Sequence, residues 1–157
     1  DSEKIVEQCF AEHKPLSFEI LDIDYFKQYN DRYGHQAGDD CVRAIAALIR
    51  QMESDQIFCA RYGGDEFVII YSGMSAEEVC ERAEKLRQDV MALQIEQRYT
   101  EGAFGVTISQ GICHDIPSNG NKNWDFLHVA DQTLYRVKRR GRNRLCMTDI
   151  HGREIEV

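Results

Sequence analysis

The sequence predicts an α+β fold with a ferredoxin-like split βαβ core, in which helices pack on an antiparallel sheet. Three observations favour it. Apolar patterns typical of strands and helices follow in the order strand, helix, strand, strand, helix, strand, with a further helix and strand at the end. A chain of 157 residues fits one domain with a core of its own. The two middle strands flank a pair of glycines, which is typical of a hairpin.

The first half of the chain supplies helices, a strand and the hairpin. Residues 1–14 have a helical pattern, and residues 16–23 alternate loosely and predict a buried strand that contains the charged Glu19. A short helix at 26–33 is ended by Gly34, and a longer helix at 39–52 has apolar residues at helical spacing. The hairpin strands are predicted at 57–61 and 67–71.

The second half alternates helix and strand. Ser75, with Glu78 three residues later, forms a capping-box pattern at the start of a helix whose apolar stripe continues to Leu93. Residues 98–105 are expected to be loop, 106–113 a strand and 118–122 a polar turn. Asn123 is expected to cap a last helix that Gly141 ends, and a short strand is predicted at 145–148.

The composition is that of a globular chain with an acidic balance. The net charge of −8 argues against a nucleic-acid polymer as partner, because such polymers require a basic surface. No apolar run approaches the roughly 20 residues of a membrane span, and no signal-peptide pattern is present. Six cysteines without a Cys-x-x-Cys pair indicate a reducing, cytoplasmic compartment, with neither a disulfide framework nor a zinc site.

Four carboxylates lie at the ends of two predicted strands that are distant in the sequence. In a split βαβ sheet the first and third strands are antiparallel neighbours, so the end of the first lies beside the start of the third. Asp22 is therefore expected next to Asp65, with Asp24 and Glu66 nearby. Hard oxygen ligands suit Mg²⁺ or Mn²⁺, and glycines let a phosphate approach the backbone. The alternative is that the acids are solvated and the glycines serve turn geometry.

Two further polar clusters each have a structural and a functional interpretation. The basic cluster near the end of the last helix either answers the helix dipole or clamps a triphosphate. The polar cluster provides either loop and N-cap chemistry, with Asp39 capping the helix that follows, or recognition of guanine, whose N–H groups a carboxylate can accept. The basic cluster comprises Lys138, Arg139, Arg140, Arg142 and Arg144, and the polar cluster comprises Asn30, Asp31, His35 and Asp39.

Three ordered motifs resemble those of GGDEF-domain diguanylate cyclases. Residues 21–39 (LDIDYFKQYNDRYGHQAGD) are similar to the first signature of that family, and residues 61–67 (RYGGDEF) contain its name motif letter for letter. Residues 130–138 (ADQTLYRVK), followed by 141–143 (GRN), are similar to its closing signature. The resemblance covers nearly the whole chain and implies a GGDEF domain, similar to nucleotidyl cyclase and polymerase palm domains.

The resemblance implies an enzyme that condenses two GTP into cyclic di-GMP and releases two pyrophosphates, by metal-assisted attack of a ribose 3′-OH on an α-phosphate. Asp22, the Ile23 carbonyl and Asp65 would ligate two Mg²⁺ or Mn²⁺ ions. Glu66 would support the metal site or act in proton transfer, and Asp65 is the position often assigned as the base. Lys27 would hold phosphates as an electrostatic clamp.

The resemblance also implies a substrate site and partners. Tyr25, Phe26, Lys138 and Arg142 would hold the phosphates, Gly64 would let the ribose phosphate pass, and Asn30, His35 and Asp39 would recognise guanine. Because one domain holds one GTP and the product contains two, catalysis requires a homodimer. Residues 1–157 are expected to be a single domain excised from a longer protein. Its upstream sensory or regulatory region could anchor the full-length protein to a membrane.

The chain departs from the family pattern in three places. Ser54 and Ile57 stand where the family often has an Arg-x-x-Asp product-inhibition site, so we expect no inhibition through that site. Gln110 replaces an apolar residue on the late strand, and an upstream Asp-x-Leu-Thr segment is missing. An inactive GGDEF domain that acts as a GTP sensor or interaction module remains the alternative to an enzyme. A cyclase that also accepts ATP is disfavoured by Asp39.

Overall fold

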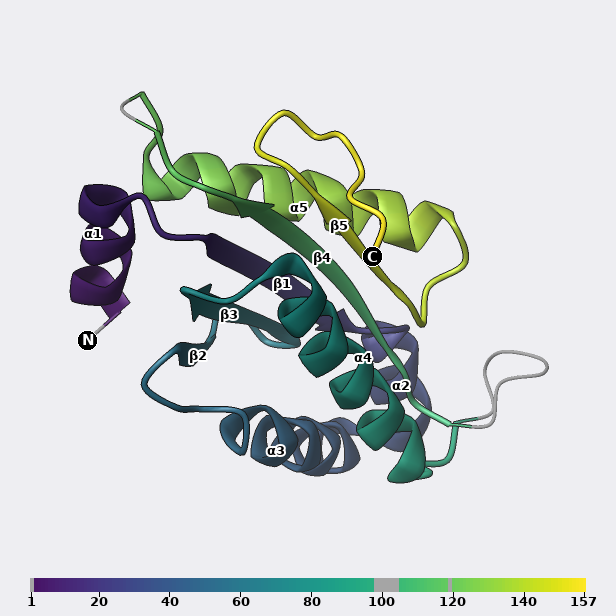
Figure 1. Ribbon diagram of the computed structural model, residues 1–157. Helices are drawn as coiled ribbons and strands as arrows, with labels where there is room; N and C mark the ends of the chain where they lie inside the picture. The colour runs from purple at the N-terminus through teal and green to yellow at the C-terminus, as the bar shows by residue number, and fades with distance from the viewer. Residues whose placement is uncertain (1, 98–104, 119) are drawn as a thin grey trace.

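The computed structural model describes residues 2–97, 105–118 and 120–157 (Figure 1). The predicted loop at 98–105 therefore lies outside the described residues, except for Gly105. No helix within these ranges is long and apolar enough to cross a bilayer. The elements are α1 Ser2–Glu12, β1 Leu16–Ile23, α2 Phe26–Tyr33, α3 His35–Arg50, β2 Ile57–Arg61, β3 Glu66–Ser72, α4 Ala76–Ala92, β4 Ile108–Asp115, α5 Asn123–Arg139 and β5 Leu145–Thr148.

The strands form one sheet in the order β2-β3-β1-β4-β5. β1 lies at the centre and pairs antiparallel with both β3 and β4, while β5 adds to β4 in parallel. The order β2-β3-β1-β4 with antiparallel pairing is that of a split βαβ core. The predicted fold class is therefore confirmed, with β5 as an addition at the edge.

Helices cover both faces of the sheet (Figure 1). α3 and α4 pack on one face, where alternate strand residues such as Leu21 and Ile69 join their apolar stripes. α1 and α5 pack on the other face, where Phe18 and Ile70 meet Phe126 of α5. Because successive side chains of a strand point to opposite faces, β1 contributes to both cores and is buried along its whole length.

The start of α3 corrects one prediction. The helix begins at His35, after Gly34, and not at the predicted residue 39, so Asp39 lies inside it and the interpretation of Asp39 as its N-cap is excluded. The extra turn forms because the Gly38 N–H donates to the Gly34 carbonyl at 3.1 Å. A Cβ on residue 38 would lie 1.7 Å from Oδ1 of Asn30 in α2, so glycine lets this turn pack against α2 without moving the Asn30 side chain.

Three other helix and strand ends refine the expectations. The capping box of α4 is confirmed, with Ser75 Oγ accepting from the Glu78 N–H at 3.1 Å. The N-cap residue of α5 is Lys122, not Asn123, and its N–H donates to Asp125 at 2.8 Å. β4 starts at residue 108, two residues later than predicted, because the Val106 N–H pairs with the Ile95 carbonyl and not with the sheet.

Two polar side chains lie in the core between the sheet and α4. Glu19 of β1 is fully buried and accepts a hydrogen bond of 2.6 Å from the Tyr71 hydroxyl. Gln110 of β4 is also fully buried and donates to the Ala83 carbonyl of α4 at 3.0 Å. Burial raises the pKa of Glu19 to about 8, so this carboxyl group is protonated at neutral pH.

Candidate active site

The ends of β1 and β3 meet as predicted. Asp22 is paired in register with Glu66, and the Ile23 N–H donates to the Asp65 carbonyl at 3.2 Å. Asp22 and Asp65 are thus neighbours in the fold, although 42 residues separate them in the chain. The juxtaposition follows from the antiparallel pairing of β1 with β3.

Asp22 is a buried carboxylate that is only partly neutralised. Its Oδ2 forms an ion pair with Lys138 of α5, while its Oδ1 is buried and has no hydrogen-bond partner in the described part of the chain. Burial raises the pKa of Asp22 to about 6, although the Lys138 ammonium acts in the opposite direction. The charges of Asp65 and Asp24 add to the increase. A second cation beside Oδ1 would relieve both the desolvation and the repulsion.

The residues present fit a hard divalent cation. Asp22 and Asp65 offer carboxylate oxygens, and Ile23, which follows Asp22, is hydrogen-bonded to the Asp65 backbone at the same strand end. Within the described ranges, no group of three or more His, Cys, Asp or Glu side chains is arranged to hold a metal. The carboxylate oxygens of Asp22 and Asp65 suit Mg²⁺, which usually retains waters and takes further ligands from substrate phosphates.

Asp24 differs from the other acids of the predicted cluster. It is 1% exposed, and its carboxylate accepts hydrogen bonds from Ser109 Oγ at 2.6 Å, Thr107 Oγ1 at 2.7 Å and the Asn143 N–H at 3.0 Å. Asp24 therefore lies near Asp22, as predicted, but protein donors bind its carboxylate, so the alternative in which it is solvated is excluded. Asp24 ties the end of β1 to β4 and to the turn after α5, a function that no local sequence pattern indicated.

The hairpin between β2 and β3 contains two glycines, although neither its backbone conformation nor local crowding requires glycine there. Neither Gly63 nor Gly64 has a positive φ, and a Cβ on Gly64 would meet nothing within 4 Å. Turn geometry therefore does not explain why residue 64 lacks a side chain. Arg61 donates to the carbonyls of Gly63 and Gly64 at 3.0 and 2.6 Å and holds the hairpin in shape.

The predicted phosphate-binding residues lie around the start of α2. Tyr25, which adopts a left-handed conformation with φ 57°, immediately precedes this helix, and Lys27 is exposed in its first turn. The Arg142 guanidinium lies 4.7 Å from the centre of the Tyr25 ring, a cation–π contact. Lys138 reaches Asp22 in the same region. The structure thus brings cations from α5 and the turn after it to the carboxylate site.

The predicted base-recognition residues lie where α2 meets α3. Asn30 of α2 packs against Gly38, and its Oδ1 is buried and has no hydrogen-bond partner among the described residues. Asp39 and His35 are exposed on α3. A buried amide oxygen without a partner is costly in a protein.

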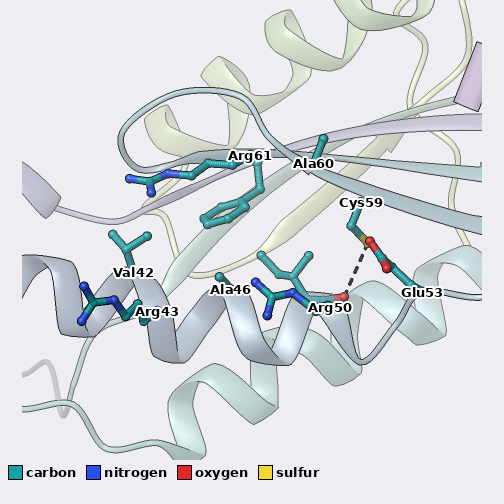
Figure 2. A pocket seen from close by; sticks show the side chains of 10 residues that line it. Val42, Arg43, Ala46, Arg50, Glu53, Cys59, Ala60 and Arg61 are labelled. Atoms are coloured by element: carbon teal, nitrogen blue, oxygen red, sulfur yellow. Dashed lines mark hydrogen bonds between the residues drawn. The ribbon is translucent and has the colours of Figure 1, made fainter.

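A groove of about 440 Å³ lies between α3 and β2, beyond the predicted carboxylates (Figure 2). Its apolar floor includes Val42 and Ala46, and Arg43, Arg50 and Arg61 stand around it. The groove does not include Asp22 or Asp65. It neighbours the hairpin through Arg61 and is separate from the strand-end site.

The fold and the site define an α+β domain of the palm-like class, with paired acids at the adjacent ends of two antiparallel strands. The family model described as "Diguanylate cyclase, GGDEF domain" matches residues 2–144. The chain belongs to the GGDEF-domain family, as the motifs indicated. Diguanylate cyclases of this family generally depend on a divalent metal.

Relatives and solved structures agree with this assignment. A diguanylate cyclase of Vibrio cholerae serotype O1 is 35% identical over 140 residues, which cover 85% of this chain and 40% of that protein. The diguanylate cyclase DosC of Escherichia coli K12 is 34% identical over 133 residues, or 83% of this chain and 28% of DosC. The chain thus spans well under two thirds of the length of these relatives.

The solved GGDEF domain of DgcB from Caulobacter crescentus, in complex with c-di-GMP, matches with a TM-score of 0.81 at 33% identity. The match covers 94% of this chain and 85% of that one. The active GGEEF domain of a diguanylate cyclase from Vibrio cholerae matches with a TM-score of 0.75 at 32% identity, over 92% of this chain and 89% of that one.

Proposed function

We propose that this chain is the half-site of a diguanylate cyclase that condenses two GTP into cyclic di-GMP. The observation that carries the proposal is the buried Asp22 carboxylate, which has one oxygen unpartnered within the described chain and has Asp65 beside it. The intact hairpin motif, in which Gly64 has open space in place of a side chain, supports a nucleotide passing next to the backbone. Family membership and the cyclase relatives add to this support.

In the proposed reaction, the 3′-oxygen of each GTP forms a bond to the α-phosphorus of the other. The bond from that phosphorus to the β-phosphate oxygen breaks, and pyrophosphate leaves. Two such steps close the ring and release two pyrophosphates and two protons. Asp65 or Glu66 takes the hydroxyl proton, and Lys27, Lys138 and Arg142 stabilise the charge on the departing phosphates.

The proposed metal site holds two Mg²⁺ or Mn²⁺ ions through Asp22, the Ile23 carbonyl and Asp65. Bound metal supplies charge neutralisation at the phosphates and lowers the pKa of the attacking hydroxyl. At Asp22 itself, the Lys138 ammonium already neutralises part of the carboxylate charge.

The proposed guanine site uses Asn30, with His35 and Asp39 on α3. The unpartnered Asn30 oxygen accepts an N–H of the base, and the Asp39 carboxylate accepts others from the guanine edge. An adenine edge presents a different set of donors and acceptors, so this pair of acceptors favours GTP over ATP.

We also propose that catalysis requires a homodimer, because each half-site holds one GTP and both must face one another. The relatives are longer than this chain, and a related DgcB structure contains a coiled coil together with its GGDEF domain. An upstream regulatory region that brings two copies together is consistent with that organisation. Such a region would set the cellular location of the whole protein, and the domain itself would work in the cytoplasm.

The experiment that tests the proposal is a turnover assay on the protein dimerised through a fused leucine zipper. GTP and Mg²⁺ should give cyclic di-GMP and pyrophosphate, resolved by chromatography, and Asp65→Ala should abolish the product without altering the far-UV circular dichroism. Asp55→Ala removes an exposed acid outside the site and serves as the matched control. Wild-type dimer that binds GTP without forming product would favour the inactive sensor instead.

A further inference from the structure

The turn after α5 has a backbone that suits Gly141 and is tolerated by Asn143 but is disfavoured by Arg142. Gly141, Arg142 and Asn143 have φ values of 115°, 65° and 48°, so three consecutive residues lie in the left-handed region. A left-handed conformation disfavours residues that have a Cβ, and Asn tolerates it better than Arg. Contacts from elsewhere in the fold must therefore hold the turn in this shape.

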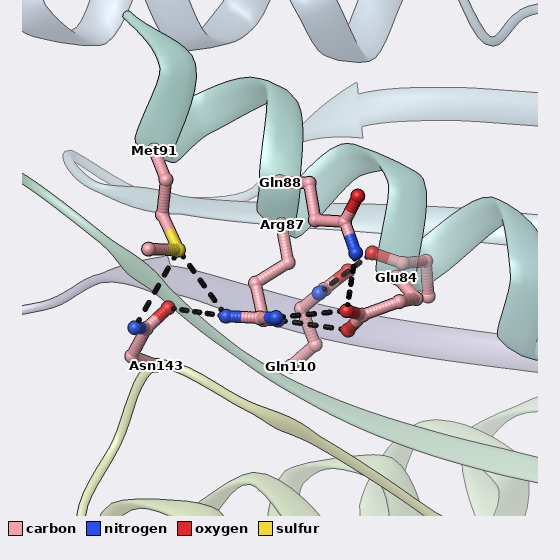
Figure 3. A network of polar contacts seen from close by, with 7 residues as sticks. Glu84, Arg87, Gln88, Met91, Gln110 and Asn143 are labelled. Carbon is pink, nitrogen blue, oxygen red and sulfur yellow. Dashed lines mark hydrogen bonds and ion pairs between the residues drawn. The ribbon is translucent and has the colours of Figure 1, made fainter. Parts of the chain in front are cut away.

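Asn143 is held from two directions. Its backbone N–H donates to the buried Asp24 carboxylate at 3.0 Å. Its side-chain Oδ1 accepts from Arg87 Nη1 of α4 at 3.1 Å, as Figure 3 shows. Glu84, one turn before Arg87, fixes that guanidinium with two contacts of 2.8 Å each. The turn is thus attached to β1 through its main chain and to α4 through one amide group.

We propose that Asn143 is a positioning residue which, held between Asp24 and Arg87, fixes Arg142 for binding the outer phosphates of GTP. Arg142 immediately precedes Asn143, and its guanidinium lies over the Tyr25 ring at 4.7 Å, next to the first turn of α2. Loss of the Arg87 contact frees the turn at one end, so Arg142 samples positions that cannot reach the phosphates. The inference rests on the proposed function, because it assumes that Arg142 contacts the triphosphate.

The contact geometry separates Arg87 from the substrate site itself. Arg87 reaches the turn from α4 and also contacts Met91 Sδ at 3.2 Å, whereas the cation paired with Asp22 is Lys138 of α5. Its proposed effect on nucleotide binding therefore passes through Asn143. Asn143→Asp retains an acceptor for Arg87, whereas Asn143→Gly removes the acceptor and keeps the left-handed backbone accessible.

The test measures binding of two ligands by calorimetry in Mg²⁺: the α,β-methylene analogue of GTP, which cannot release pyrophosphate, and GMP, which lacks the outer phosphates. Arg87→Met and Asn143→Gly should each weaken binding of the analogue about tenfold, the effect of losing one hydrogen bond to a charged group. Both should leave GMP affinity within about twofold. The double variant should bind the analogue no more weakly than the single variants do, since both substitutions remove the same hydrogen bond between Arg87 and Asn143.

Two controls make the outcome decisive. Asn143→Asp should bind the analogue as the wild type does, and Lys85→Met should too, because Lys85 is an exposed α4 cation that pairs with Asp89 on the same helix. Equal losses for GMP and the analogue, or unchanged affinities in Arg87→Met and Asn143→Gly, would overturn the positioning role. Wild-type protein that binds neither nucleotide would instead overturn the proposed function.

Discussion

Glu19 allows a test of how burial in the core changes the pKa of a carboxyl group and the stability of the protein. The carboxyl group is fully buried on the central strand, and burial raises its pKa to about 8 from an ordinary value of 4.5, while the Tyr71 hydroxyl donates to it. The folded protein therefore binds a proton at Glu19 that the unfolded chain releases. We expect that replacing Glu19 by Gln, which is neutral at every pH, removes a pH dependence of stability.

The sign and size follow from proton linkage. Because the folded pKa is the higher one, the contribution of Glu19 to stability is fully present below pH 4.5 and is lost as the pH rises through 8. Between pH 5 and pH 8, the wild type should lose about 3–4 kcal/mol of unfolding free energy at this residue, at 1.36 kcal/mol per pKa unit. That loss is a large share of the roughly 5–15 kcal/mol of a typical domain.

The assay is urea unfolding followed by far-UV circular dichroism at pH 5, 6, 7 and 8. Asp22 also titrates in this range, so the quantity of interest is the difference between Glu19→Gln and wild type at each pH. That difference should shift by about 3–4 kcal/mol in favour of the variant from pH 5 to pH 8. Glu81→Gln, at an exposed position on α4, is the matched control and should show no shift. A constant difference across the range for Glu19→Gln would refute the reasoning.

Three further predictions concern the site. Gly64→Ala should leave the unfolding free energy within about 0.5 kcal/mol of wild type, because the added Cβ meets nothing. If the nucleotide passes next to Gly64, the same substitution should lower kcat/KM at least about tenfold. Unchanged kinetics would count against that passage. Gly38→Ala should destabilise the protein by about 1–3 kcal/mol in the same urea assay, because the Cβ would collide with Asn30. Wild-type stability of the variant would show that the Asn30 side chain moves aside at little cost. Asp39→Ser should reduce the preference for GTP over ATP, measured as a ratio of kcat/KM, by roughly 10- to 100-fold, and an unaltered ratio would remove Asp39 from guanine recognition.

Sequence reasoning located the secondary structure well where periodicity or capping was strong. The α4 capping box at Ser75 and the strand at residues 16–23 were both predicted correctly. The start of α3 was missed because Asp39 is a good N-cap residue locally, whereas the extra turn depends on Gly38 packing against Asn30 of another helix. A contact between two helices decided that boundary, and a local propensity cannot register such a contact.

In the candidate site, too, some features were predictable from the sequence and others depend on tertiary contacts. The topology of the core was sufficient to predict that Asp22 and Asp65 meet, because strand order and direction follow from the order of the elements. The spacing of Asp22 and Asp24 could not predict that their carboxylates differ in hydrogen bonding. One retains a buried oxygen without a partner in the described chain, and the other is satisfied by Thr107, Ser109 and the Asn143 backbone.

The sequence by itself determined the family, the order of helices and strands, and the set of acids, glycines and cations at the site, because motifs and periodicity are properties of the chain read in order. Only the tertiary structure decided the environment of each group: Glu19 is kept neutral by burial, Gly64 is free of any steric demand, and Asn143 is attached to α4 through Arg87. These differences arise from desolvation and from contacts between residues far apart in the chain, which exist only once the sheet and its helices have packed.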